Sequence, residues 1–252
     1  MLEVRNLSRN FGGLVAVSDL SFSVGENEIR GLIGPNGAGK TTTFNVISGF
    51  YPPSAGQVLF RGENISGMRT SAIAARGLVR TFQATTLFQE LTVMENVLVG
   101  CHLRARTNPL RALVGADRRR EAAARDKSLE ILDFFGLGDR RDDPAMSLPH
   151  GLQRSLGVAV AFAADPKLLL LDEPFTGMNP EETRQMMEIA RKVRDRGVTL
   201  LLVEHDMQAV MGLCDRITVL NFGKLLTEGT PDEVRQHPDV IEAYLGAATD
   251  AA

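Results

Sequence analysis

The sequence predicts an α/β protein in which strands and helices alternate along most of the chain. Glu28–Ile33 looks like a strand that runs directly into a glycine-rich loop. Lys167–Leu171 and Val198–Val203 are continuous apolar runs, as expected of parallel strands covered on both faces. Between about residues 87 and 160 this alternation stops, and the pattern predicts a mostly helical insertion into the α/β core.

The composition is that of an ordinary globular chain. The 252 residues are 44% hydrophobic and 23% charged, and the formal net charge is −3. The length allows a sizeable buried core, and the charge gives no electrostatic basis for nucleic acid binding. No apolar run approaches a membrane span, the N-terminus lacks a signal-peptide plan, and Cys101 and Cys214 have no metal-site spacing. We therefore expect a reduced, cytoplasmic protein whose membrane role depends on a partner.

The N-terminal part predicts an antiparallel sheet followed by a helix. Leu2–Val24 alternates short apolar and polar steps and is interrupted at Gly12 and Gly13. Gln57–Gly62 looks like a further strand that ends at a turn, and Thr41–Ser48 predicts a helix directly after the glycine-rich loop.

Two helices are expected in the insertion. Asp117–Phe135 has an apolar stripe and is followed by Gly136 as a stop signal. The basic run Arg118–Arg120 at its start is interpreted as a solvated face. Gln153–Ala164 predicts a second helix, small and apolar enough to be buried.

The α/β alternation then resumes to the end of the chain. Pro180, preceded by Asn179 as the N-cap, opens a helix that ends at Gly197. Arg216–Leu220 and Lys224–Thr227 flank a short turn and predict a hairpin. Short helices are expected at Asp232–Gln236 and Asp239–Leu245.

The glycine-rich loop carries the strongest chemical signal. It fits the phosphate-binding pattern G-x-x-x-x-G-K-[ST] with Gly34-Pro35-Asn36-Gly37-Ala38-Gly39-Lys40-Thr41. Backbone N–H groups in such a loop form an anion site, and the N-terminus of the next helix points its dipole at the same phosphate. Lys40 is expected to reach the β- and γ-phosphates, and the Thr41 hydroxyl is expected to bind Mg²⁺.

Polar residues follow other predicted strands at the edge of the sheet where this loop opens, and ligands bind at that edge in parallel sheets. Asp172 suits the Mg²⁺ shell, through water, and Glu173 suits positioning or deprotonating the attacking water. His205 ends the next apolar strand and could hold the γ-phosphate. Gln83 follows a third strand-like stretch and is a candidate for sensing Mg²⁺ and the water.

Phe11 is an aromatic residue in a predicted polar loop, Arg9–Gly13. Its ring could stack on adenine through its π-face. It could equally pin the hairpin, and the sequence leaves both interpretations open.

With these motifs in order, the chain resembles the ATP-binding subunits of ABC transporters over essentially its whole length. The resemblance is closest to bacterial importers of branched-chain amino acids, through Arg80–Gln83, Leu87–Val97, Gly177–Pro180 and the tail from Gly229 to Gly246. It implies a P-loop NTPase core of the ABC type with an N-terminal antiparallel β subdomain. The core would comprise about residues 1–86 and 161–252, with a helical subdomain inserted at about 87–160. Importers of urea or short amides look similar, so the solute stays open between these classes.

The resemblance also implies ligands, partners and roles. Two subunits, identical or paralogous, pair head to tail around two ATP with Mg²⁺, each Gly34–Thr42 loop facing the signature segment of the other. Two transmembrane permease subunits, touched by Gln83 and Ala84–Val97, hold the dimer at the cytoplasmic face of the membrane, and a solute-binding protein acts indirectly. Phe11 becomes the adenine-stacking residue, Glu173 the catalytic carboxylate and His205 the γ-phosphate switch. The intersubunit loop is Thr176–Pro180.

The chain departs from this family at the signature Leu-Ser-Gly-Gly-Gln. The aligned residues are Leu148-Pro149-His150-Gly151-Leu152, of which only Leu148 and Gly151 match. Pro149 removes a hydroxyl and a backbone N–H donor. We expect a helix start near Gln153 to face the phosphate across the dimer, with Gly151 allowing close backbone approach and a weakened contact. Alternatively, His150 supplies a replacement donor.

The sequence is compatible with three functions to different degrees. The first is an ATP-hydrolysing subunit that powers a membrane importer. A non-transport ATPase acting on DNA or ribosomes is disfavoured because the chain has no coiled coil, paired nucleotide domain or basic surface. A weakly hydrolysing nucleotide-sensing subunit is motivated by the altered signature, but Glu173 and His205 argue against it.

Overall fold

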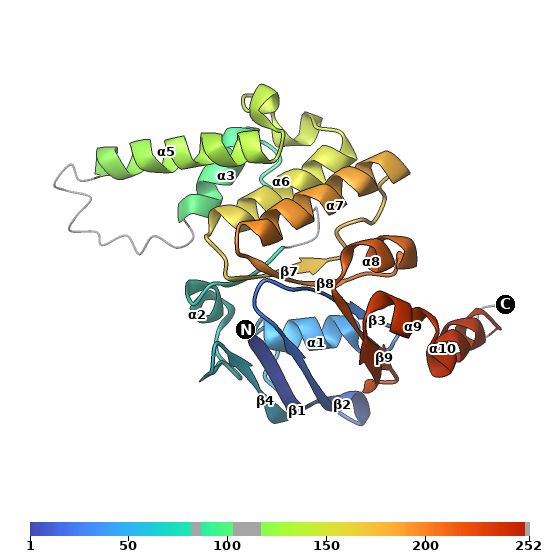
Figure 1. Cartoon of the computed structure of the whole chain (residues 1–252). Helices are drawn as coiled ribbons and strands as arrows, with labels where there is room; N and C mark the ends of the chain where they lie inside the picture. Colours follow the sequence, from blue (N-terminus) through green and yellow to red (C-terminus); the bar gives the residue numbers. More distant parts are fainter. Residues whose placement is uncertain (82–86, 103–116, 250–252) are drawn as a thin grey trace.

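The computed structural model describes residues 1–81, 87–102 and 117–249, and within them it has the predicted α/β fold (Figure 1). An antiparallel sheet of four described strands has the order β2-β1-β4-β5. A second sheet, of six described strands, has the order β10-β9-β3-β8-β7-β6. Its strands are parallel except for β10, which pairs antiparallel with β9.

The bounds of the elements are as follows. The antiparallel sheet contains β1 (Leu2–Phe11), β2 (Leu14–Val24), β4 (Ala55–Phe60) and β5 (Glu63–Asn64). The second sheet contains β3 (Ile29–Ile33), β6 (Leu78–Arg80), β7 (Leu168–Asp172), β8 (Thr199–Val203), β9 (Arg216–Asn221) and β10 (Lys224–Gly229). The described helices are α1 (Lys40–Ile47), α2 (Thr70–Ala75), α3 (Val93–His102), α5 (Asp117–Phe134), α6 (His150–Ala163), α7 (Pro180–Asp195), α8 (Met207–Leu213), α9 (Pro231–Arg235) and α10 (Pro238–Thr249).

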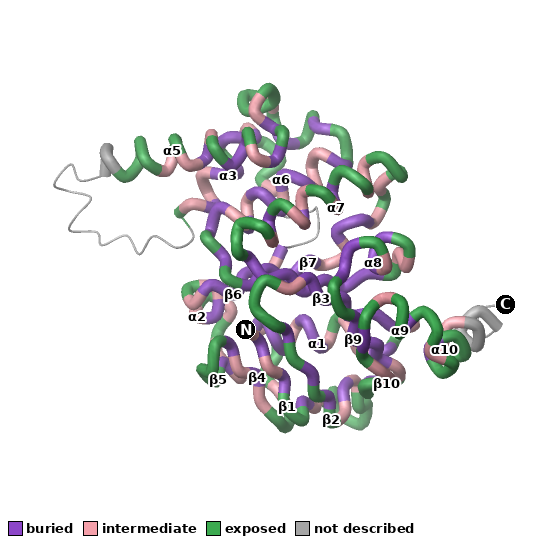
Figure 2. The backbone as a smooth tube through the Cα atoms, viewed as in Figure 1, coloured by how far each residue is buried: buried purple, intermediate pink, exposed green. Residues whose placement is uncertain are grey.

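The elements form layers on the two faces of the second sheet. On one face, Leu32, Leu170 and Leu201 pack with Phe44 of α1 and with the antiparallel sheet. On the other face, the alternate residues of the same strands pack against α3, α5, α6, α7 and α8. Alternate residues of a strand point to opposite faces, so strands covered on both sides are expected to be nearly continuous apolar runs. Figure 2 accordingly shows β3 and β7 buried at the centre of the molecule.

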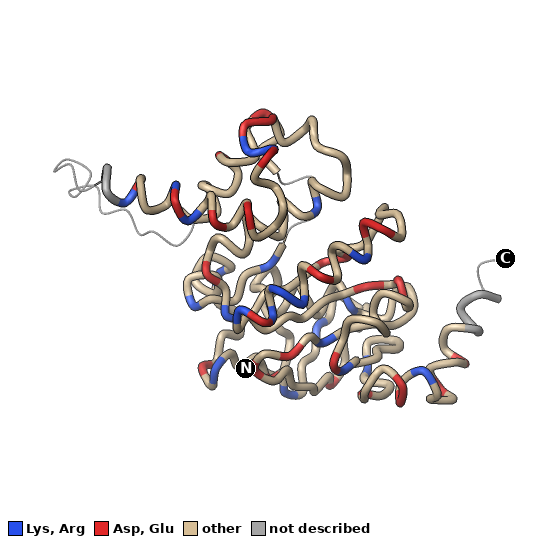
Figure 3. Tube along the Cα trace, turned by 45° about the horizontal axis from the view of Figure 1, so that its top comes forward, with Lys and Arg blue, Asp and Glu red and all other residues tan. Residues whose placement is uncertain are grey.

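Helix α7 begins and ends as its sequence predicts. The Asn179 side chain accepts hydrogen bonds from the N–H groups of Glu181 and Glu182, and the Glu182 carboxylate accepts the Asn179 N–H. This capping box fixes the first turn, and acidic residues there and basic residues in the last turn suit the helix dipole. Figure 3 shows that basic and acidic residues are mixed along the described backbone.

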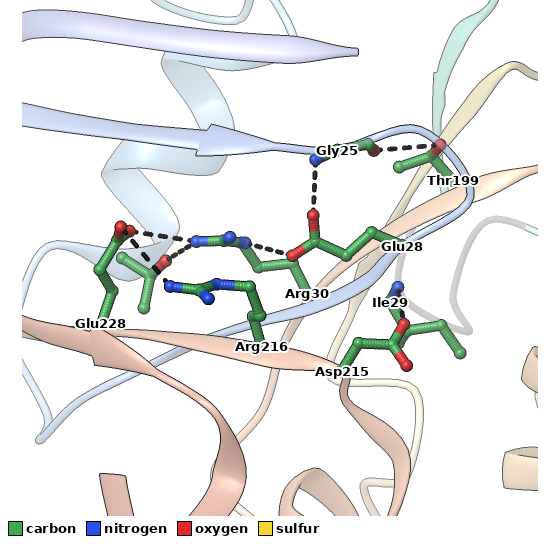
Figure 4. Close-up of polar contacts among 9 residues, drawn as sticks. Gly25, Glu28, Ile29, Arg30, Thr199, Asp215, Arg216 and Glu228 are labelled. Carbon is green, nitrogen blue, oxygen red and sulfur yellow. Dashed lines mark hydrogen bonds and ion pairs between the residues drawn. The ribbon is translucent and has the colours of Figure 1, made fainter. Parts of the chain in front are cut away.

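A buried arginine anchors β3 below the glycine-rich loop (Figure 4). Arg30 is 3% exposed. Its guanidinium donates to Glu28 at 2.7 Å, to the Thr218 hydroxyl at 3.1 Å and to Glu228 at 3.1 Å. The Glu28 carboxylate also accepts the Gly25 N–H at 2.6 Å. A buried charge is tolerated only when it is paired and hydrogen-bonded, so these contacts fix β3 against β9 and β10.

Most predicted elements are confirmed, and one start is wrong. The hairpin turn at Phe222 and Gly223 has positive φ at both residues, as a two-residue hairpin turn requires. The second helix of the insertion begins at His150, three residues before the predicted Gln153. The predicted bounds of the insertion, about 87 and 160, stay a prediction, and α6 runs across the second of them.

Candidate functional site

The glycine-rich loop leaves β3 at its carboxyl end and enters α1, and two of its glycines are required by close packing. Gly34 has φ 150°, and a Cβ there would lie 2.1 Å from the Leu220 carbonyl oxygen. Gly39 has φ 96°, and a Cβ there would lie 2.7 Å from the Ala16 carbonyl oxygen. Only glycine adopts such backbone at this separation, so both positions are sterically fixed.

The hairpin of β9 and β10 braces the loop from outside. The Gly223 N–H donates to the Ala38 carbonyl at 3.1 Å, and the Gly223 carbonyl accepts the Ser18 N–H at 2.8 Å. The turn therefore joins the loop to β2, and the loop conformation is held by both sheets.

Lys40 curls back over its own loop. Its ammonium donates to the carbonyls of Gly34 at 2.6 Å and Pro35 at 2.9 Å. Burial lowers the pKa of Lys40, while the nearby Glu173 carboxylate acts in the opposite direction. The cation is thus held beside the N–H groups of the loop, where an anionic ligand gains most from it.

The first turn of α1 presents its N–H groups without a side-chain cap. Gly39 is the N-cap residue and offers no capping side chain, and the first turn contains no acidic residue. The Thr43 hydroxyl instead donates to the Gly39 carbonyl at 2.9 Å. Thr41 and Thr42 lie in this turn, which has the free amides and positive dipole end that bind phosphate.

Asp172 and Glu173 stand at the carboxyl end of β7, as predicted. Glu173 has φ 48°, a left-handed conformation that costs a non-glycine residue of order 1–3 kcal/mol. Its N–H donates to the Val203 carbonyl at 3.0 Å, and its carboxylate accepts the Thr176 hydroxyl at 3.3 Å. Together these contacts turn the chain sharply out of the sheet directly after Asp172.

Arg80 is a site residue that the sequence pattern did not reveal. Its guanidinium donates to Asp172 Oδ2 at 2.7 Å, and both side chains are about nine-tenths buried. Thr81 adds a hydroxyl that accepts the Asp172 N–H at 3.3 Å. No local signal could have shown this contact, because it joins the ends of two strands that are far apart in the sequence.

Glu204 is a second residue that the pattern did not single out. Its fully buried carboxylate accepts the N–H of Phe175 at 2.8 Å and the N–H of His205 at 2.9 Å. Burial raises the pKa of Glu204, and the N–H groups act in the opposite direction. The carboxyl group of Glu204 therefore joins the loop that follows Glu173 to the segment that contains His205.

His205 lies beside this carboxyl group and beside Glu173. Its Nδ1 is 3.8 Å from Glu204 Oε2 and 4.0 Å from Glu173 Oε1. Its side chain is 61% exposed, so the imidazole can reach a ligand at the sheet edge. The predicted group of Lys40, Asp172, Glu173 and His205 is thus gathered at one edge of the sheet.

Phe11 is the last residue of β1 rather than part of a loop. Its ring meets Tyr51 edge-on, with 5.2 Å between the ring centroids. The Arg9 guanidinium lies 4.5 Å from the centre of the Phe11 ring. These contacts hold the ring at the end of the hairpin, and its 37% exposure leaves surface for a base.

The segment aligned with the family signature is the start of α6. Pro149 is the N-cap residue and makes no side-chain cap. The predicted helix start near Gln153 is wrong, because α6 begins at His150 and the Gln153 N–H donates within the helix to the Pro149 carbonyl at 3.0 Å. Proline suits a helix start because its φ is pre-set, which moves the open amides to residues 150–152. Gly151 is buried, and a Cβ there would lie 2.6 Å from Glu182 Oε1.

The structure does not test the role predicted for Gln83. Gln83 lies outside the described residues. A cavity of about 260 Å³ between α5, α6 and the start of β7 is lined by none of the predicted site residues. Among the described residues, no helix has the length and apolar character to cross a membrane.

The donor set at the sheet edge fits a hydrated Mg²⁺. Thr41 offers a hydroxyl oxygen at the start of α1, and Asp172 offers a carboxylate oxygen at the carboxyl end of β7, which is separated from β3 by β8. Mg²⁺ prefers oxygen ligands and is usually held by one or two carboxylates with water and substrate phosphates.

Comparison with known proteins places this architecture among transport ATPases. The family model described as "ABC transporter" matches residues 17–176, and the one described as "Branched-chain amino acid ATP-binding cassette transporter" matches residues 224–250. The chain is 45% identical over 251 residues to the high-affinity branched-chain amino acid transport ATP-binding protein LivG of Salmonella typhimurium, covering 98% of each chain. It is 44% identical to the corresponding protein BraF of Pseudomonas aeruginosa, again covering 98% of each. The ADP conformation of an ATP-binding cassette of an ABC transporter aligns with a TM-score of 0.86 and 29% identity, covering 98% of each chain.

Proposed function

This chain belongs to the family of ABC transporter ATP-binding proteins, and on that premise we propose that it powers a membrane importer of branched-chain amino acids. The solute is inferred from LivG and BraF, whose names specify branched-chain amino acid transport. The match of residues 224–250 to a branched-chain-specific model supports the same class.

One observation carries the proposal. The loop from Gly34 to Thr41 ends at Lys40 and α1, and the same sheet edge brings Asp172, Glu173 and His205 beside it. A cation, free helix amides, a carboxylate for Mg²⁺, a second carboxylate and an imidazole are the groups that nucleoside triphosphate hydrolysis uses.

Each residue has a distinct task in this proposal. The loop amides and Lys40 bind the β- and γ-phosphates, while Phe11 stacks on the adenine. Thr41 and Asp172 would hold Mg²⁺, which would neutralise charge on the phosphates when bound. Glu173 orients the water and accepts its proton, and His205 contacts the γ-phosphate. Because Glu173 and His205 are 4.0 Å apart, one water can be held between them and the phosphate.

The partners follow from the same proposal. A second ATP-binding subunit, identical or paralogous, places the first turn of its α6, with Gly151, opposite the loop. Gln83 senses Mg²⁺ and the water, and together with residues 84–97 it touches the permease. Two permease subunits hold the pair at the cytoplasmic face of the membrane, and a solute-binding protein delivers the amino acid.

The test compares two site variants with matched exposed controls. Lys40→Ala should abolish ATP binding measured by calorimetry on the full chain, because the loop loses its cation. Glu173→Gln should keep ATP binding but lower the hydrolysis rate of the transporter complex by about 100- to 10,000-fold, the usual contribution of a general base. Lys192→Ala and Glu188→Gln, at exposed positions of α7, should leave both quantities unchanged.

Two outcomes would contradict the proposal. If Lys40→Ala binds ATP as tightly as wild type, the loop is not the phosphate site. If proteoliposomes containing the complex accumulate urea or short amides but not labelled leucine, isoleucine or valine, the solute assignment is wrong although the ATPase assignment holds.

A further inference from the structure

Arg80, the last residue of β6, is placed at the junction of three elements. Its side chain is 9% exposed and donates to Asp172 Oδ2 at 2.7 Å. Its Nη1 donates to Asn45 Oδ1 at 2.7 Å and to the Ser48 hydroxyl at 3.1 Å. The guanidinium also lies 5.7 Å and 5.5 Å from the ring centres of Phe44 and Phe50. This many contacts fix the guanidinium in one position.

The helix partners of Arg80 share a face with Thr41. Residues separated by three or four positions lie next to each other on a helix surface. Asn45 follows Thr41 by four positions, and Ser48 follows Asn45 by three, at the C-cap of α1. Arg80 therefore holds the row of α1 that begins at the hydroxyl expected to bind Mg²⁺.

The other partner is the carboxylate expected to complete that site. Asp172 Oδ2 is occupied by Arg80, whereas no described side chain or backbone N–H donates to Oδ1. One oxygen is thus committed to the arginine and the other remains for the hydrated metal. A single guanidinium thus bonds to both α1 and Asp172, in addition to the apolar packing of Phe44 with Leu170.

An arginine is required for this geometry. The planar guanidinium can direct one terminal nitrogen to a carboxylate and the other to a helix, whereas a lysine ammonium is a single point with one stem. The charge also matters, because a carboxylate that is 10% exposed is costly to bury without a cationic partner.

We propose that Arg80 is a positioning residue for the Mg²⁺–nucleotide complex, which sets the separation between the Thr41 hydroxyl and the Asp172 carboxylate by binding α1 and β7 together. The inference rests on the proposed function, since it assigns a role within that same ATP site. Groups that orient metal ligands typically change metal affinity or activity by about 10- to 100-fold when removed.

The test separates Mg²⁺ dependence from nucleotide binding. Full-length Arg80→Met is compared with wild type in two measurements: ATP affinity by calorimetry in EDTA, and the Mg²⁺ concentration that half-saturates ATP hydrolysis in the transporter complex. We expect ATP affinity in EDTA to stay within about twofold, because the loop amides and Lys40 are untouched. The half-saturating Mg²⁺ concentration should rise by about 10- to 100-fold.

Three further variants keep the test falsifiable. Arg76→Met is the matched control, since Arg76 is a nearby arginine whose ion pair with Glu63 lies at the surface, and it should match wild type. Arg80→Lys should restore part of the Mg²⁺ affinity, because it keeps the charge but loses the fork. If Arg80→Met does not fold, Asn45→Ala removes the shorter of the two hydrogen bonds from Arg80 to α1 and leaves the bond to Ser48, and it should still raise the half-saturating Mg²⁺ concentration by a few fold.

The outcomes distinguish a failure of the positioning role of Arg80 from a failure of the proposed ATPase function. If wild type neither binds nor hydrolyses ATP, the proposed function fails. If wild type hydrolyses ATP and Arg80→Met shows the same Mg²⁺ half-saturation, the positioning role is overturned. A loss of Mg²⁺ affinity in Arg76→Met equal to that in Arg80→Met would also overturn it.

Discussion

Replacing Pro149 by serine tests what the altered signature does to catalysis. Pro149 is the N-cap of α6 and has φ −52° and ψ 150°, a conformation that serine adopts without strain. A serine hydroxyl there can accept a hydrogen bond from the N–H of Gly151 or Leu152, and it can simultaneously donate to a phosphate of the partner subunit's nucleotide.

The two effects of this substitution differ in size. A serine cap stabilises a helix by about 0.5–2 kcal/mol, but replacing proline frees the unfolded chain and costs about 0.4–1 kcal/mol. The free energy of unfolding should therefore change by about 1 kcal/mol or less, a shift of about 2–4 °C in Tm at most for a chain of this size. A hydrogen bond to a charged phosphate contributes about 1.5–3 kcal/mol, which corresponds to roughly a 10- to 100-fold higher hydrolysis rate if it is made in the transition state.

The assay is steady-state ATP hydrolysis by the assembled transporter, with Tm measured on the same preparations. Pro144→Ser is the matched control, because Pro144 is also an exposed N-cap proline, of the short 3₁₀ turn at Ala145–Ser147. We expect ATP hydrolysis to be faster than wild type in Pro149→Ser but not in Pro144→Ser. An unchanged or slower rate with an unchanged Tm would refute the argument that this position faces the nucleotide of the partner, and an equal gain in Pro144→Ser would refute its specificity.

Two further predictions concern the buried charges. Arg30→Met leaves Glu28 and Thr218 without their buried partner, so the free energy of unfolding should fall by about 3–5 kcal/mol. For a chain of this size the Tm measured by thermal denaturation should therefore drop by roughly 6–20 °C. A drop in Tm of less than about 2 °C would show that the hydrogen bonds and ion pairs of Arg30 contribute little to stability. Burial raises the folded-state pKa of Glu204, so its contribution to stability is complete below the unfolded pKa of about 4.3 and is lost as the pH rises through the folded pKa. Glutamine does not titrate in this range, so the free energy of unfolding of wild type relative to Glu204→Gln should decrease as the pH rises from about 4 towards neutrality. Urea denaturation midpoints of the two proteins measure this difference at each pH. A difference that stays constant or grows with pH would contradict the prediction.

Local patterns were sufficient wherever one segment determines its own structure. The phosphate loop, the fully apolar strand β7, the Asn179 cap and the hairpin turn at Gly223 were all predicted, since each depends on neighbouring residues. The predicted start of α6 is three residues too late, because proline lacks a donor but also suits the first positions of a helix. The role of Gln83 stays a prediction, because this residue lies outside the described part of the chain.

Arg80 and Glu204 could not have been found in this way. The bond of Arg80 to Asp172 joins residues 92 positions apart, and that of Glu204 to the Phe175 N–H joins residues 29 positions apart. Sequence spacing gives the strand on which a residue lies, but it does not give the partner that its side chain meets across strands. A charged residue next to an apolar run can be a solvent-exposed side chain at the end of a strand, or it can form a buried ion pair or hydrogen bond.

The buried side chains of Arg80 and Glu204 also explain how the site can be ordered although the backbone of Glu173 is strained. Removing an ionised group from water costs several kcal/mol even after relaxation, so each group persists only because its hydrogen bonds are satisfied. Arg80 is satisfied by Asp172 and α1, and Glu204 by the N–H groups of Phe175 and His205. Glu173 lies between them in the chain with its unfavourable φ of 48°. Asp172 before it is held by Arg80, and Phe175 after it is held by Glu204. A change of the Glu173 backbone that broke either contact would leave a buried polar group without its partner, which offsets the strain energy of about 1–3 kcal/mol. The Glu173 carboxylate, which is catalytic in the proposed function, is thus kept in place by the contacts of its neighbours as well as by its own bonds to Val203 and Thr176.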